Sequence, residues 1–137
     1  MKRYLIDASI VLKSLLTEND LAAERFNFIL RSSDAGKTEV ISPPLLITEV
    51  ANGIRFSEKN SEAGVNYFKA FLKLPIKYHK PSKTLHNKIL ELSYMLGTTV
   101  YDTSYHVFAK VHNATFLTCD EDYYQKARQI GHIELVR

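Results

Sequence analysis

Four acidic residues occupy positions from which carboxylates could meet. Asp7 and Asp120 each follow a short apolar run that predicts a strand. Asp102 opens a helical pattern, and Glu49 lies within another, beside its apolar stripe. Carboxylates without a fixed cation among them repel one another unless a hard dication neutralises them. Oxygen ligands suit Mg²⁺ or Mn²⁺, and these ions activate water for the cleavage of phosphate esters.

Each acid also has an ordinary structural interpretation. Asp7, Asp102 and Asp120 all precede helical patterns, where an aspartate side chain caps free N–H groups. Taken alone, each is explained as well by a cap as by a site. Glu49 could reach solvent or pair with Arg55 or Lys59. It is the hardest to explain this way, because a carboxylate buried beside apolar residues needs a partner or a metal.

Alternating strands and helices must position these acids. Apolar and turn patterns predict strands at 4–6, 39–42, 76–79, 115–118 and 133–136. They predict helices at 10–16, 45–56, 60–74, 83–96, 102–112 and 121–130, and another from 21 onwards, capped by Asn19 or Asp20. This order predicts an α/β fold, a three-layer α/β/α sandwich with a parallel sheet of about five strands. Ligands bind at the carboxyl edge of such sheets, which is where the acids arrive.

Composition limits the possible classes of protein. With 137 residues, 45% of them hydrophobic, the chain suits a single domain spanning residues 1–137. The net charge of +3 permits nucleic-acid binding without requiring it. No uncharged run is long enough to span a bilayer, and no signal-peptide pattern follows Met1. Cys119 is the only cysteine, which fits a reducing compartment, so we expect a cytoplasmic protein.

The segments around the four acids also resemble a known family. They are Leu5-Ile6-Asp7-Ala8-Ser9, Pro43-Pro44-Leu45-Leu46-Ile47-Thr48-Glu49-Val50-Ala51-Asn52, Val100-Tyr101-Asp102-Thr103-Ser104-Tyr105 with Ala109, and Leu117-Thr118-Cys119-Asp120-Glu121-Asp122. In this order and spacing they resemble PIN-domain ribonucleases, and most closely the VapC-like toxins of type II toxin–antitoxin pairs. The resemblance covers essentially the whole chain.

This resemblance implies a single PIN domain that cleaves single-stranded RNA with Mg²⁺ or Mn²⁺. Asp7, Glu49, Asp102 and Asp120 match the acidic metal-binding quartet of the family. Thr118 matches a hydroxyl position beside the fourth acid, so these five residues are the expected catalytic set. The family also implies a homodimer and a cognate antitoxin that lays an amphipathic segment into a groove.

Some neighbouring residues have two interpretations. The hydroxyls of Ser9 and Thr118 could orient a carboxylate or a water, or could simply bond to the backbone. Asp122 falls where some family members carry a further acid. The lysine-rich run at 77–88 could guide RNA phosphates or form a solvated face.

Two other functions fit parts of the pattern. A phosphoryl-transfer receiver needs an acidic pair after the first strand and a phosphoacceptor after the third, but Lys2 and Arg3 precede the first strand and residues 76–80 contain no acid. An aspartyl phosphatase needs a second aspartate where Ser9 stands. A non-catalytic PIN-like module that binds RNA or protein would have no need of four acids. We therefore expect a Mg²⁺- or Mn²⁺-dependent endoribonuclease that acts as the toxin of a toxin–antitoxin pair.

Overall fold

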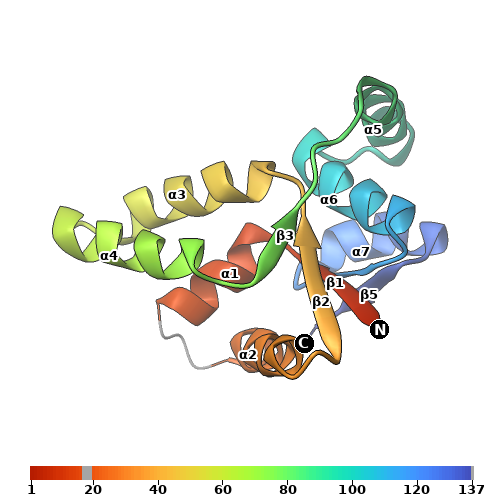
Figure 1. Ribbon diagram of the computed structural model, residues 1–137. Coiled ribbons are helices and arrows are strands. Elements are labelled where there is room, and N and C mark those ends of the chain that lie inside the picture. The colour runs from red at the N-terminus through yellow and green to blue at the C-terminus, as the bar shows by residue number, and fades with distance from the viewer. Residues whose placement is uncertain (17–19, 137) are drawn as a thin grey trace.

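Five parallel strands form the centre of the computed structural model, which describes residues 1–16 and 20–136 (Figure 1). The strands lie in the order β3-β2-β1-β4-β5. Their bounds are β1 Lys2–Ile6, β2 Thr38–Ser42, β3 Ile76–Tyr78, β4 Thr115–Thr118 and β5 Ile133–Leu135. The strand order reverses beside β1, which pairs with β2 on one side and β4 on the other. The crevice beyond the carboxyl ends of β1 and β4 is therefore the switch point at which such sheets bind ligands.

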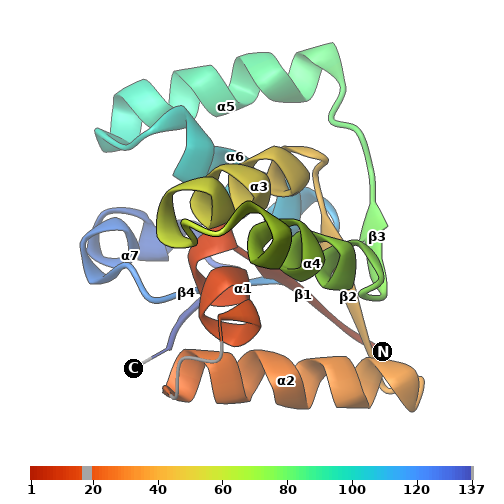
Figure 2. The ribbon, with the colours of Figure 1, turned by 90° about the vertical axis from the view of Figure 1, so that its left-hand side faces the viewer.

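Helices cover both faces of the sheet, which confirms the predicted three-layer α/β/α sandwich (Figures 1 and 2). One layer contains α1 (Ala8–Leu15), α2 (Leu21–Asp34), α3 (Leu45–Ser57) and α4 (Ser61–Leu72). The other contains α6 (Val100–Val111) and α7 (Glu121–Ala127), followed by the 3₁₀ turn η1 (Arg128–Ile130). The remaining helix, α5 (Lys83–Leu96), packs on the outer side of α6. No helix in the described ranges is long and apolar enough to cross a membrane.

Strand β1 is central because its sequence can be buried on both faces. Leu5 and Ile6 are 0% and 1% exposed, as expected for a parallel strand covered by two helical layers. A close approach of α1 and α3 fixes one of those layers. A Cβ at Gly53 would lie 2.2 Å from Leu12 Cδ1, so the two helices meet where α3 has no side chain.

Most predicted elements are present, with shifted ends. Ser82 caps α5 and accepts a hydrogen bond from Leu85 N at 3.1 Å, and Gly97 closes that helix with φ of 66°. Asp20 caps α2, whereas Asn19 lies outside the described residues. The helices predicted at 60–74 and 121–130 end earlier, at Leu72 and Ala127.

The predicted start of the sixth helix is wrong. We expected 98–101 to be extended and Asp102 to begin the helix, but α6 begins at Val100. The cap is Thr99, whose hydroxyl accepts a hydrogen bond from Asp102 N at 3.1 Å. Asp102 therefore stands in the first helical turn, where its charge is stabilised by the helix dipole.

Candidate functional site

Asp7 directly follows β1 and caps α1. It can therefore be a helix cap and, at the same time, part of a site at the edge of the sheet. Its Oδ1 accepts hydrogen bonds from Ile10 N at 3.1 Å and from Ser9 Oγ at 2.7 Å. Within the described part of the chain, its Oδ2 accepts none. Burial, with smaller contributions from the charges of Asp102 and Glu49, raises the pKa of Asp7 to about 6 despite these two bonds. The ionised form of Asp7 is thus disfavoured where it lies near two other acids.

Glu49 has a partner that its own helix does not provide. It lies in the second turn of α3 and accepts a hydrogen bond from the Tyr105 hydroxyl on α6. Tyr105 is 2% exposed and stacks on Phe116, with ring centroids 6.1 Å apart. Burial, the bond to Glu49 and the nearby acids all raise the pKa of Tyr105 well above its usual range. The phenol therefore stays protonated and donates a hydrogen bond to Glu49.

Tyr105 was missed by the sequence analysis. The available signal was its spacing from Asp102, because residues three apart share one side of a helix. A tyrosine on the same side as an expected metal ligand is a candidate for holding another ligand in place. We had considered a basic residue of α3 or solvent as the partner of Glu49, and the observed partner is neither.

Asp102 in the first turn of α6 and Asp120 at the cap of α7 line the same pocket. Burial raises the pKa of Asp102, and the charge of Asp120 adds to this, although a bond with Thr99 opposes it. Asp120 caps α7 through Tyr123 N at 2.9 Å, and its own backbone N donates to Thr118 Oγ1 at 3.0 Å. The Thr118 hydroxyl, 1% exposed, thus binds the backbone, whereas the Ser9 hydroxyl binds a carboxylate.

A small polar pocket opens beside Asp102 and Asp120. Its volume is about 180 Å³, and it is lined by Gly97, Thr98, Thr99, Asp102, Asp120, Asp122, Tyr123 and Lys126. Lys126 Nζ lies 3.6 Å from Asp122 Oδ2 and 3.4 Å from Gly97 O. The sequence analysis placed no cation among the acids, yet this pocket has one. Lys126 is paired with the outer acid, Asp122, and not with the inner two.

The four expected acids are electrostatically connected but do not form a closed ligand cage. Asp7 interacts with Glu49 and Asp102, and Asp102 interacts with Asp120. Among residues 1–16 and 20–136, no three His, Cys, Asp or Glu side chains are grouped so that they could hold a metal ion. The donor set still fits Mg²⁺ or Mn²⁺, because Mg²⁺ keeps several waters and uses one or two carboxylates together with substrate phosphates.

Comparison with known proteins assigns this arrangement to a family. The model of the PIN domain family matches residues 4–129. The chain belongs to the PIN domain family. Comparison with curated proteins gave no match.

Solved structures share the fold of this PIN domain at low sequence identity. VapBC2 from Rickettsia felis, bound to a DNA fragment from their promoter, is similar with a TM-score of 0.70 and 15% identity, over 98% of this chain and 99% of that one. PAE2754 from Pyrobaculum aerophilum is similar with a TM-score of 0.66 and 20% identity, over 91% of this chain and 86% of that one. VapBC-1 from nontypeable Haemophilus influenzae is similar with a TM-score of 0.63 and 16% identity, over 93% of each chain.

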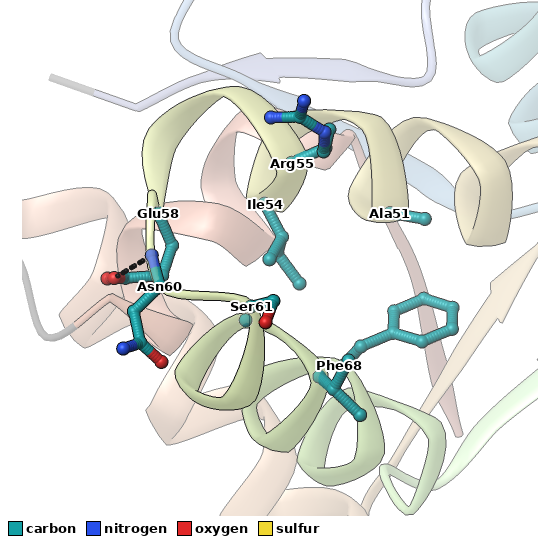
Figure 3. A pocket seen from close by; sticks show the side chains of 9 residues that line it. Ala51, Ile54, Arg55, Glu58, Asn60, Ser61 and Phe68 are labelled. Carbon is teal, nitrogen blue, oxygen red and sulfur yellow. Dashed lines mark hydrogen bonds between the residues drawn. The ribbon is translucent and has the colours of Figure 1, made fainter.

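This PIN domain also has an apolar groove between α3 and α4 (Figure 3). The groove has a volume of about 250 Å³ and is lined by Ala51, Ile54, Arg55, Glu58, Asn60, Ser61, Gly64, Val65 and Phe68. Ile54 and Phe68 lie on its two sides, and Asn60 N donates to Glu58 Oε1 at 3.1 Å at one end. The groove and Glu49 are therefore built on the same helix, α3.

Proposed function

We propose that this PIN domain is a Mg²⁺- or Mn²⁺-dependent endoribonuclease and the toxin of a toxin–antitoxin pair. The observation that carries the proposal is the position of Asp7, which is half-buried at the switch point of the sheet, where the charges of Glu49 and Asp102 act on it. Ionising Asp7 there is costly unless a positive charge arrives. Asp7, with Glu49 and Asp102 beside it, would hold a dication there, and that ion would supply the positive charge for both the carboxylates and an RNA phosphate.

The residues of the chain orient the acids before anything binds. Ser9 and the α1 cap fix one oxygen of Asp7, and Tyr105 fixes one oxygen of Glu49. A bound dication supplies charge neutralisation and an activated water. The carboxylates of Asp7, Glu49, Asp102 and Asp120 would hold it. Because Ser9 and Tyr105 already orient two of these carboxylates, little rearrangement is needed to bind the ion. Orienting metal ligands in this way is the usual role of the residues that surround a metal site.

An RNA-cleavage assay tests this function. Labelled single-stranded RNA is incubated with the protein in EDTA, in Mg²⁺ and in Mn²⁺, and dication binding is measured separately by calorimetry. We expect cleavage only with a dication, and binding of the same dication without RNA. If the protein binds RNA but neither cleaves it nor binds a dication, the chain is a binding module and the proposal is wrong.

The α3–α4 groove supports a proposal about the antitoxin. An amphipathic helix binds such a groove through apolar residues at helical spacing. Val65 is 54% exposed at this groove, which indicates an apolar surface open to a partner. A segment in the groove would lie along α3, close to the turn that carries Glu49. We further infer that two copies of the chain associate, which the exposed Tyr94 and Met95 on α5 support.

Substituting Val65 with aspartate is expected to abolish the antitoxin complex. The new charge would be buried in the groove without a partner, which is costly. The measurement is co-purification with the small protein encoded beside this chain. Leu72→Asp is the matched control, because Leu72 is on the same helix and 52% exposed but does not line the groove. Retention of the complex by both variants would place the partner elsewhere.

A further inference from the structure

The positive charge of the chain is concentrated in one segment. Residues 63–90 contain six of the 18 basic residues, all of them lysine, and none of the 15 acidic residues. The remainder of the chain is net acidic. The six lysines are all exposed, and they are Lys69, Lys73, Lys77, Lys80, Lys83 and Lys88. This segment runs from α4 through β3 to the first half of α5. Strand β3, the loop that follows it and the start of α5 lie along one side of the molecule (Figure 2).

A pocket connects this basic segment with the acids. It has a volume of about 300 Å³, and four separate parts of the chain line it: the turn between β2 and α3, the loop between β3 and α5, α5 itself and α6. Leu45, at the start of α3, lies one helical turn before Glu49 on the same side of the helix. Ser104 of α6 is two residues beyond Asp102. Through Leu45, the pocket thus adjoins the turn of α3 that precedes Glu49.

The lining of this pocket suits one nucleotide. Three prolines, Pro43, Pro44 and Pro81, provide flat apolar surface, and Lys80, His86 and Ser104 provide polar groups. No acidic side chain lines it. Proteins bind single-stranded nucleic acid by stacking bases on aromatic rings, including histidine, and by placing cations on the phosphates. Here His86 provides the ring, and the prolines provide apolar contact around it. The volume is at the lower end of the range for ligand pockets, which fits a single base and excludes a duplex.

We propose that this proline pocket holds one base of the RNA strand beside the nucleotide that is cut, with Lys80 on the adjacent phosphate. The RNA would then meet two kinds of surface. The scissile phosphate lies at the acids and the dication that they would hold, and the lysines of the basic segment bind the phosphates that lead away from them. The inference rests on the proposed function for the identity of the substrate. It does not require that cleavage occurs.

Binding of RNA in EDTA tests the role of Lys80 without cleavage. Fluorescence anisotropy with a labelled single-stranded oligoribonucleotide is measured across a salt series. We expect Lys80→Gln to weaken binding about 3- to 10-fold and to reduce the salt slope by about 0.7, the value for one phosphate contact on a single strand. Lys37→Gln is the control, because Lys37 is also an exposed lysine but precedes β2 at the opposite edge of the sheet. Its affinity should stay within about twofold of the parent protein.

Photo-cross-linking locates the base directly. An oligoribonucleotide with one 4-thiouridine is irradiated on the metal-free protein, and the linked peptides are identified by mass spectrometry. We expect links within 79–89 or at Ser104. Links confined to other parts of the chain, such as the α3–α4 groove, would overturn the proposal, as would unchanged binding by Lys80→Gln or no RNA binding by the parent protein.

The two proposals fail in different ways. Cross-links in the proline pocket without any dication-dependent cleavage would uphold this site and reject the nuclease function. Cleavage without such cross-links would uphold the nuclease function and reject this site.

Discussion

Asp7→Asn is expected to abolish RNA cleavage and, at the same time, to stabilise the metal-free protein above pH 6. Asparagine caps a helix as well as aspartate does, so the bonds from Ile10 N and Ser9 can persist. What is lost is the charge that would attract a dication. The expected fall in cleavage rate is about 1,000-fold or more, since a removed metal ligand disables the activated water.

The gain in stability follows from the direction of the Asp7 pKa shift. Burial first, then the neighbouring acids, raise this pKa from 3.8 to about 6 in the folded protein. The folded state therefore favours the protonated carboxyl, and its stabilising contribution is present at low pH and is lost as pH rises through 6. Asparagine has no charge to lose. Because solvent reaches part of the side chain, we expect a gain of about 1–2 kcal/mol in the free energy of unfolding at pH 8.

Thermal unfolding at pH 4.5 and pH 8, with and without Mg²⁺, measures both effects. The parent protein should be stabilised by Mg²⁺ at pH 8 through mass action, and the variant should not. Without Mg²⁺, the variant should have the higher melting temperature at pH 8 and lose that advantage at pH 4.5. Asp34→Asn, at an exposed acid that ends α2, should change neither result. A variant that is less stable than the parent at pH 8 would contradict this account of Asp7.

Tyr105→Phe is expected to lower the cleavage rate about 10- to 100-fold, the usual cost of removing a group that orients a metal ligand. The substitution removes one oxygen, which leaves Glu49 without its observed donor but keeps the ring that packs on Phe116. Glu49 then has more freedom, so a higher dication concentration is needed for half-maximal activity. RNA binding in EDTA should not change, because the phenol is 2% exposed and does not reach the surface.

The dication titration separates this role from a general loss of structure. Tyr4→Phe is the matched control, because Tyr4 is a second buried tyrosine, 8% exposed, in β1 and away from the acids. Removing the Tyr4 hydroxyl should leave the dication concentration for half-maximal activity unchanged. If Tyr105→Phe leaves that concentration and the rate unchanged, Tyr105 has only a packing role.

The sequence was sufficient to predict how the acids reach the edge of the sheet. Asp7 directly follows β1 and Asp120 is two residues beyond β4, so any parallel arrangement puts both at the carboxyl edge. The order of the strands was not predictable in the same way, because it depends on contacts between distant segments. The family resemblance, not the local pattern, implied that four acids act together, and that set stays a prediction.

The links between distant side chains are what the sequence could not show. Tyr105 and Glu49 are 56 residues apart, and only the packing of α6 and α3 across the sheet joins them. The proline pocket likewise combines residues from four segments, each of which is unremarkable alone. The start of α6 was misplaced for a local reason: apolar Val100 and Tyr101 looked extended, and the capping by Thr99 was not recognised.

Gly53 makes the spacing of two acids depend on a residue that carries no charge. Asp7 begins α1 and Glu49 belongs to α3, and the two helices touch where Gly53 meets Leu12. A methyl group at position 53 would require the Leu12 side chain to move, because its Cδ1 lies 2.2 Å from where that Cβ would be. The approach of the helices that carry Asp7 and Glu49 therefore involves a glycine and a leucine, each more than one helical turn away from the carboxylate on its own helix.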